Sequence, residues 1–502
     1  MSKYEEAMLE LEKLSEKQLW AAEQAFRAKS CMPMTGRYGR VNEKFQDEGS
    51  EFALMANRVS MELQYLGLVY PFIQSQPSEE NEMISESEEM KQLNEFSNNL
   101  VENFSISDFF EIKGFEETTR HDVKAVEYFI DKKLREAGLE QFVPYVHIGC
   151  TSEDTNNTAY AMIMENCLFI WYEEAAKLTA KLSKMAYENR KVPMLGHTHG
   201  QPATPLTFGH AIAVDCYRLR ESLKMIQTLP IKVKLNGAVG NIAAMKVAYP
   251  DKDWMGFSES FAESMNFEHN PISSQIENHD YMVRFFNEIG LFNSIVANIS
   301  QNLWDYISRD YLKQISKKGE IGSSTMPHKT NPIDAENAWS NAETSTYAAI
   351  GLARKLPFSR MQRDLSDSST QRTIPMVFLH SYQAIKSLER MLDRVEVNES
   401  VMLKDLENNP EVLSEAIQTV LRKNGYQNAY EVMKDMTRGK KVTMESLREF
   451  ISSLEISEKD KENLLKLEPK TYIGYSVEYV EKYFGPGSDI ETSLLAAYCL
   501  KK

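Results

Sequence analysis

The feature that most constrains the fold is an apolar stripe within a long stretch that contains no proline. Proline is absent from residue 272 to residue 326. Within this stretch apolar residues recur at steps of three and four, the spacing of one face of a long α-helix with a coiled-coil-like seam. The stripe is formed by Met282, Phe285, Ile289, Phe292, Val296, Ile299 and Leu303, and Trp304 and Ile307 widen it. Such a face must be covered, so we expect a bundle of long helices whose outer stripes are covered by other subunits.

Two further blocks, residues 145–192 and 206–229, also lack proline and are rich in Ala, Leu, Met, Glu and Lys. Few segments have the pattern of a strand. At 502 residues the chain is too long for one core. We therefore predict an all-α fold with an N-terminal helical domain at 1–143, a central bundle at 144–395 and a C-terminal helical domain at 396–502.

In the two proposed end domains, turn and loop segments interrupt the helical patterns more often than in the central one. Residues 1–143 have shorter helical patterns, interrupted at 32–36 and by an acidic, Ser-rich patch at 74–89. We expect this patch to be solvated and without a catalytic role. After residue 395 the patterns shorten again, and residues 438–441 and 485–487 have the composition of turns.

Charge and cysteine content exclude some classes of protein. The formal net charge is −16, which argues against nucleic acid as the main partner, because phosphate backbones attract surplus Lys and Arg. An anionic small substrate then requires cations gathered in one cleft. The five scattered cysteines have no zinc-type spacing and predict reduced thiols. The N-terminus has no apolar signal region and no apolar run approaches a membrane span, so we expect a cytoplasmic protein without a membrane partner.

One segment has the composition of a loop that carries chemistry. Residues 322–332 read GSSTMPHKTNP, with a glycine, hydroxyls, a cation and an amide placed around two prolines. The serines compete for backbone hydrogen bonds, and the prolines remove donors and fix φ. The segment favours neither a helix nor a strand, so we predict a functional loop.

A second candidate is the turn at residues 196–205, GHTHGQPATP, which places His197 and His199 two residues apart between glycines and prolines. The segment can be a polar turn between helices. Its two histidines could also bind a metal, but no Asp, Glu or Cys lies nearby in the sequence to complete the coordination shell. Acid–base chemistry fits best, because histidine is readily poised near neutral pH.

Three polar segments complete the set. Residues 119–124 (TRHDVK) are expected to begin a helix and send separate side chains into a cleft. Residues 151–157 (TSEDTNN) are typical of a helix N-terminus, which caps and can also bind anions. Residues 359–372 hold three arginines among hydroxyls and are either a solvated loop or an oxyanion clamp. A phosphate-binding loop at 319–329 fails because His328 precedes Lys329, and no GxGxxG follows a strand.

Together these segments resemble the fumarase/aspartase superfamily, whose signature loop matches residues 322–332 throughout. Within it, the segments at 120–123, 151–154, 198–205 and 363–368 resemble the adenylosuccinate lyase family. The resemblance covers roughly residues 30–480 and is closest to the enterobacterial branch. It implies a three-domain helical subunit, a homotetramer with each active site built from three subunits, and no cofactor or metal.

The resemblance also implies a reaction: β-elimination of fumarate from adenylosuccinate, and from the succinylated carboxamide intermediate of purine synthesis. By this analogy His199 is the general acid that protonates the departing nitrogen, and Ser323 is the general base. Lys329 and Asn331 hold the succinyl carboxylates, and Gly322 gives the loop freedom to close. The remaining substrate-binding residues implied by the family are Arg37, Tyr38, Arg120, His121, Asp122, Thr151, Ser152, Gln275, Asn337, Arg363, Ser368 and Arg372.

Two other hypotheses remain. The first is another lyase of the superfamily, acting on argininosuccinate, aspartate or malate; the arginine-rich 359–372 segment argues against it, because those substrates have no phosphate. The second is an inactive scaffold that kept the fold, which predicts loss of His199 or Ser323, and both are present.

Overall fold

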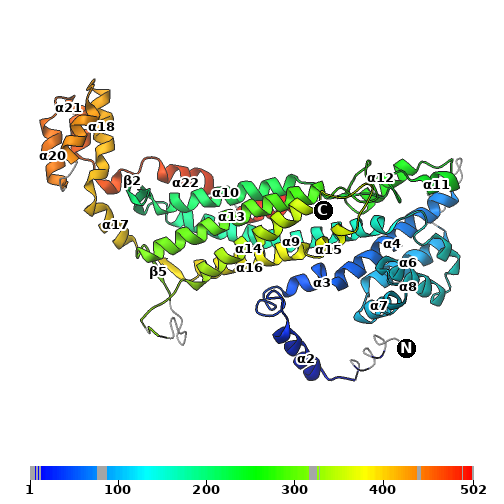
Figure 1. The fold of residues 1–502 in the computed structure, drawn as a ribbon. Coiled ribbons are helices and arrows are strands. Elements are labelled where there is room, and N and C mark those ends of the chain that lie inside the picture. Colours follow the sequence, from blue (N-terminus) through cyan, green and yellow to red (C-terminus); the bar gives the residue numbers. More distant parts are fainter. Residues whose placement is uncertain are drawn as a thin grey trace.

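Long helices lying side by side form the middle of the molecule in the computed structural model (Figure 1). The structure describes residues 6, 10, 13–75, 87–315, 325, 326, 328–437, 442–488 and 490–499. The bundle consists of α9 (Ser152–Glu188), α10 (Phe208–Thr228), α13 (Asp280–Ser308), α14 (Ile333–Lys355) and α16 (Ile374–Leu392). The all-α prediction is confirmed, because strands in the described part form only short two-stranded pairs.

The predicted apolar stripe lies on α13 and is buried. Each of its seven members, from Met282 to Leu303, is at most 2% exposed, and they pack into one core with α9, α10, α14 and α16. The two residues expected to widen it behave differently: Ile307 is half-buried at the edge of the core, but Trp304 is 42% exposed. Trp304 therefore departs from the expected core stripe within one chain.

A group of shorter helices covers one end of the bundle (Figure 1). Its own apolar core includes Val59, Leu66, Phe129 and Phe142. The elements of the N-terminal part are α2 (Glu16–Lys29), η1 (Glu43–Phe45), α3 (Gln46–Gly49), α4 (Glu51–Gln74), α6 (Glu88–Glu102), α7 (Ile106–Thr119), α8 (Asp122–Glu136) and η2 (Glu140–Tyr145). The predicted acidic patch at 74–89 lies mostly outside the described residues; α4 ends at Gln74, the first residue of the patch, and α6 begins at Glu88, near its end.

Near this end the chain also makes small elements between α10 and α13 and before α16. Strands β3 (Lys232–Val233) and β4 (Glu268–His269) pair in parallel. The helices are α11 (Ala243–Ala248), α12 (Trp254–Ser264) and α15 (Ser366–Gln371). Part of the 359–372 segment is thus a short helix, although its composition predicted a loop.

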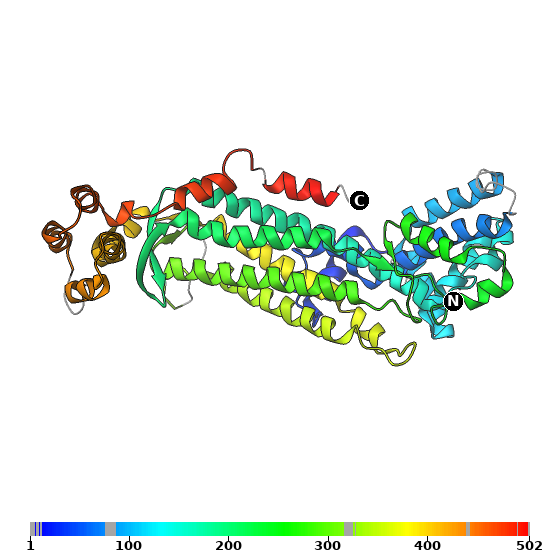
Figure 2. The ribbon, with the colours of Figure 1, turned by 90° about the horizontal axis from the view of Figure 1, so that it is seen from above.

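The opposite end carries the C-terminal elements. Strand β5 (Leu312–Gln314) pairs antiparallel with β6 (Val395–Val397) where the chain leaves the bundle. The elements that follow are α17 (Glu399–Asn408), η3 (Pro410–Leu413), α18 (Ser414–Lys423), α19 (Ala429–Thr437), α20 (Met444–Ser453), α21 (Glu458–Leu465), η4 (Pro469–Thr471), α22 (Ser476–Phe484) and α23 (Ile490–Cys499). Seen from above, α18, α20 and α21 project beyond the bundle, whereas α22 and α23 return along it (Figure 2). The basic turn predicted at 438–441 lies outside the described residues.

The segment predicted as a turn between helices is in fact a β-hairpin at this end. Strands β1 (Pro193–Thr198) and β2 (Gln201–Thr207) pair antiparallel, with Thr198 opposite Gln201. His199 and Gly200 form the two-residue turn, and both have left-handed backbone, with φ of 54° and 72°. Two positive φ values match the right-handed twist of the strands. The hairpin therefore holds His199 at its exposed tip.

Candidate active site

Two helix N-termini bring the first predicted residues together. His121 is the N-cap of α8, and its Nδ1 accepts a hydrogen bond of 3.1 Å from the backbone N–H of Lys124. Its Nε2 lies 3.3 Å from the hydroxyl of Ser152, the first residue of α9. The predicted helix start at His121 and Asp122 is confirmed, whereas the expected cleft beside it stays a prediction. Arg120, one residue earlier, is the exposed C-cap of α7 in left-handed backbone, with φ of 50°.

Asp122 is held by two arginines. Its Oδ2 lies 2.8 Å from Nη2 of Arg58, which is buried, and 3.5 Å from Nη2 of the half-exposed Arg372. Burial alone raises the pKa of the Asp122 carboxyl, but Arg58 outweighs it and the pKa lies below its ordinary value. Asp122 is therefore ionised at neutral pH. Arg58 is a residue that the sequence pattern did not single out.

The arginine-rich segment meets the loop before α13. Arg363 Nη2 donates to the hydroxyl of Ser368 at 3.2 Å, and its Nη1 lies 3.5 Å from Oε1 of Gln275. The same Nη1 forms an ion pair of 2.7 Å with Glu153. The backbone supports this meeting, because Gln275 N–H donates to the carbonyl of Gln362 at 3.2 Å. Three residues predicted to bind the substrate thus converge from two distant segments.

A buried ion pair stabilises the N-terminus of α9. Asp154 and Lys234 are both fully buried, with 2.8 Å between Oδ1 and Nζ. Asp154 Oδ2 also accepts a 2.8 Å hydrogen bond from the backbone N–H of Thr151, the N-cap of α9. The helix start predicted at 151–154 is confirmed, and these contacts fix the backbone that carries Thr151 and Ser152.

A further pair lies along the bundle. The side-chain amide of Asn337, near the start of α14, donates to the hydroxyl of Tyr38 at 3.0 Å. The amide oxygen of Asn337 accepts from Ser387 at 2.6 Å, so its orientation is fixed. Arg37 is exposed beside Tyr38.

The hairpin stands apart from these clusters. Arg309, the C-cap of α13, donates from Nη1 to Nε2 of His197 at 2.9 Å. Burial and this cation lower the pKa of His197, so its ring is neutral at neutral pH and cannot itself be a charged acid. His199 is exposed two residues further on.

The described part of the signature loop lies at the same end of α13. Gln314 in β5 donates to the carbonyl of Thr330 at 2.9 Å, which places Lys329 and Asn331 beside the β5–β6 pair. Lys329 is exposed and Asn331 is half-buried. Ser323 and Gly322 lie outside the described residues.

Helix α13 separates the two groups. Its 29 residues make it roughly 45 Å long at 1.5 Å of rise per residue. Its N-cap, His279, contacts Gln371 of α15 at 3.1 Å, close to Ser368 and Arg372. Its C-cap, Arg309, contacts the hairpin. Within one chain, the predicted acid therefore lies at the opposite end of α13 from Arg363, Ser368 and Arg372. Asn337 and its partner Tyr38 lie toward the hairpin end, because the neighbouring Glu336 accepts a hydrogen bond from Trp304 near the end of α13.

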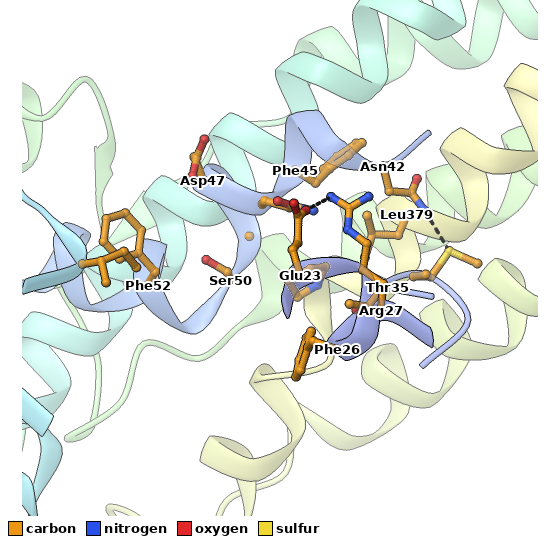
Figure 3. A pocket seen from close by; sticks show the side chains of 15 residues that line it. Glu23, Phe26, Arg27, Thr35, Asn42, Phe45, Asp47, Ser50, Phe52 and Leu379 are labelled. Atoms are coloured by element: carbon orange, nitrogen blue, oxygen red, sulfur yellow. Dashed lines mark hydrogen bonds and ion pairs between the residues drawn. The ribbon is translucent and has the colours of Figure 1, made fainter. Parts of the chain in front are cut away.

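A cavity of about 500 Å³ lies elsewhere, under α2 (Figure 3). Its wall is largely apolar and includes Phe26, Phe45 and Leu379, while its cation, Arg27, is paired with Glu23 at 2.6 Å. None of the predicted site residues lines it. In the described part of the chain, no group of three or more His, Cys, Asp or Glu side chains has the arrangement of a metal site. Among the same residues no helix is long and apolar enough to cross a membrane.

Comparison with known proteins shows which family the chain belongs to. Residues 44–344 match the family described as Lyase, and residues 359–473 match the family described as Adenylosuccinate lyase C-terminal. The adenylosuccinate lyase of Haemophilus influenzae is 41% identical over 453 residues, covering 90% of this chain and 97% of that protein. The adenylosuccinate lyase of Escherichia coli K12 is 38% identical over 458 residues, with the same coverage.

Solved structures agree on the fold. The 3-carboxy-cis,cis-muconate lactonizing enzyme of Pseudomonas putida superposes with a TM-score of 0.67 at 20% identity, over 95% of this chain and 99% of that one. A fumarate lyase from Mesorhizobium gives 0.67 at 16% identity, over 89% and 98%. Fold and sequence together define a lyase of the fumarase/aspartase superfamily. More narrowly, the chain belongs to the adenylosuccinate lyase family.

Proposed function

We propose that this lyase eliminates fumarate from adenylosuccinate, giving AMP, and from the succinylated aminoimidazole carboxamide ribotide, in purine nucleotide biosynthesis in the cytoplasm. The family supports the reaction, since relatives 38–41% identical over 90% of the chain are adenylosuccinate lyases. The observation that carries the substrate is the convergence of Arg363, Ser368 and Gln275 beside His121 and Ser152. An arginine fork with neighbouring hydroxyls and amides suits a phosphate-bearing nucleotide.

The chemistry we assign needs one base and one acid. Ser323 removes the proton from the carbon beside a succinyl carboxylate, and His199 gives a proton to the departing nitrogen. A serine is a weak base at its ordinary pKa, so the loop must close on it and place Lys329 and backbone N–H groups near the alkoxide in a site without bulk water. No cofactor is required for these steps.

The largest contribution should come from fixed positive charge and hydrogen-bond donors. Loss of the proton leaves a carbanion that spreads its charge onto the adjacent carboxylate, and donors placed in advance stabilise that charge. We assign this work to Lys329 and Asn331, with Thr151 and Ser152 on a substrate carboxylate. The nucleotide is assigned to Arg37, Tyr38, Asn337, Arg363, Ser368 and Arg372, and its orientation to Arg120, His121, Asp122 and Gln275.

We further infer that the active unit is a homotetramer with sites shared between subunits. The separation of His199 from the Arg363 group along roughly 45 Å of α13 supports this, because one chain cannot close such a gap around a small molecule. Exposed apolar side chains on the bundle, such as Leu291, Tyr347 and Ile350, offer faces for packing against other copies.

An absorbance assay with adenylosuccinate tests the proposal directly. Formation of AMP and fumarate by the purified, assembled protein is the expected result. A well-folded tetramer that does not turn over adenylosuccinate or the carboxamide substrate would refute the assignment.

A further inference from the structure

Glu153 is a charged side chain in an unusual place. It is the second residue of α9 and is 1% exposed. Its Oε1 accepts from Nη1 of Arg363 at 2.7 Å and from the amide of Asn156 at 2.8 Å. Its other oxygen, Oε2, is buried and has no hydrogen-bond partner in the described part of the chain.

This arrangement is a poor way to stabilise a fold. Burying an ionised carboxylate is unfavourable unless its oxygens are well paired, and a well-packed apolar pair of similar size is often as stable. Glu153 has one oxygen paired and one unpaired. Its position next to Arg363 is better explained by what it does to that arginine.

Glu153 fixes the plane of the Arg363 guanidinium. Arg363 reaches Glu153 and Gln275 through Nη1 and Ser368 through Nη2, so both terminal nitrogens are engaged. The 2.7 Å ion pair is the shortest of these three contacts. An arginine fork grips an oxyanion well only when its plane is set beforehand, because the five N–H groups have a rigid geometry.

Hydrogen bonds also connect the Glu153 carboxylate to Arg58 and Asp122 through Asn156. Asn156 Oδ1 accepts from Nε of Arg58 at 3.0 Å, and Arg58 Nη2 pairs with Asp122 at 2.8 Å. Arg58 is 2% exposed and Asn156 is 8% exposed, so this chain of contacts runs through the interior. It connects the start of α8 to the arginine-rich segment.

We propose that Glu153 is a positioning residue for substrate binding: its buried carboxylate, oriented by Asn156 and Arg58, sets the Arg363 guanidinium in the plane that receives the nucleotide phosphate. This inference rests on the proposed function, since the contact of Arg363 with the nucleotide is part of it. Glu153 is almost fully buried behind Arg363 and has no assigned part in proton transfer, so it should affect binding of the nucleotide and not the chemical step.

The test is Glu153→Gln, which keeps the size and an acceptor oxygen but removes the charge. A hydrogen bond to a charged group strengthens binding enough that its loss should raise the KM for adenylosuccinate roughly ten- to a hundredfold. We expect kcat to stay within about threefold. Inhibition by AMP, which carries the phosphate, should weaken in parallel with the KM, whereas inhibition by fumarate should not change.

Glu174→Gln is the matched control. Glu174 is also a buried glutamate of α9 with a cationic partner, Lys386 at 2.8 Å, and it lies far along the helix from Glu153. This variant loses a buried charge without touching Arg363, so KM and AMP inhibition should stay at the wild-type values. If Glu153→Gln does not assemble, Glu153→Asp keeps the charge, withdraws it by one methylene and should weaken AMP inhibition in the same direction.

A second variant separates the positioning role of Glu153 from the binding role of Arg363. Arg363→Lys keeps a charge but lacks the fork, and it should weaken AMP inhibition by itself. Adding Glu153→Gln to it should then change little, because both act on one contact. If Arg363→Lys leaves AMP inhibition intact, the proposed role of Arg363 fails and this inference fails with it. If Arg363→Lys weakens it but Glu153→Gln leaves it unchanged or tightens it, or if Glu174→Gln has the same effect, only the positioning role is overturned.

Discussion

The hydroxyl of Tyr38 accepts a 3.0 Å hydrogen bond from the side chain of Asn337, across a sequence separation of 299 residues. This contact fastens the segment before α3 to the start of α14. Both residues are among those implied by the family to bind the substrate. The contact therefore gives a physical reason why two such distant positions should act on the same ligand.

Replacing Tyr38 with Phe should weaken substrate binding without harming the fold. A neutral hydrogen bond contributes about 0.5–1.5 kcal/mol, so KM for adenylosuccinate should rise roughly two- to tenfold in Tyr38→Phe. Steady-state kinetics measure this, with Tyr430→Phe as the control at an exposed tyrosine of α19. Equal KM values for both variants would remove Tyr38 from the binding site.

The buried pair under the start of α9 should matter for stability. In Lys234→Met the fully buried Asp154 loses its cation, which should lower the free energy of unfolding by roughly 3–5 kcal/mol. The comparison is Lys224→Met, which breaks the exposed pair with Glu221 and should change it by about 1 kcal/mol or less. Thermal or denaturant unfolding decides between the two; an unchanged midpoint in Lys234→Met contradicts the stabilising role of the buried pair.

Stability should also depend on pH through His147. Burial lowers the pKa of this histidine, but the buried Glu62 carboxylate 2.7 Å away raises it further, to about 9 from an ordinary 6.5. Because the folded value is the higher one, the stabilisation is fully present below pH 6.5 and is lost as pH rises through 9. It amounts to about 3 kcal/mol per subunit.

Unfolding of the wild type and of His147→Gln at about pH 6 and about pH 9.5, on either side of this window, measures the effect. The wild type should lose more stability than the variant on going to the higher pH. Parallel losses in both proteins would show that the Glu62–His147 pair does not carry the dependence.

The acid and the base should each be indispensable. His199→Ala and Ser323→Ala should lose roughly 10²–10⁴-fold or more in kcat while keeping the native assembly, because each removes a proton-transfer group. His197→Gln is the neighbouring control, since the neutral His197 ring is engaged with Arg309 and has no assigned role in proton transfer. Near-normal turnover in either alanine variant would void its assigned role.

Local patterns predicted the long elements well. The stripe from Met282 to Leu303 is buried, and Thr151 and His121 cap helices as expected. Both features depend on residues close together in the sequence, so a local pattern is enough to predict them. The hairpin that carries His199 was missed. Its strands are short and contain prolines, and its turn has His-Gly where Asn-Gly is the usual signal.

Contacts between distant residues could not be predicted in the same way. Arg58 has no feature in the sequence that distinguishes it from other arginines on helices. No local pattern predicts that it pairs with Asp122, or that Glu153 pairs with Arg363. The acid at position 153, two residues after the helix N-cap Thr151, was the available signal, but an acid in the first turn of a helix is ordinary as well. The domain boundaries near 143 and 395 and the catalytic roles remain predictions, and Ser323 lies outside the described residues.

The most direct test mixes two variants, each of which lacks one residue assigned to the site. His199→Ala alters the hairpin end of each chain and His121→Ala alters the other end, and we expect these two residues of one site to come from different subunits. After unfolding and refolding of an equal mixture, random assembly should leave roughly a quarter of the sites with both native residues, and activity should recover to about that fraction of the wild type. If subunit exchange is verified and the mixture is no more active than the average of its parents, the shared site is contradicted.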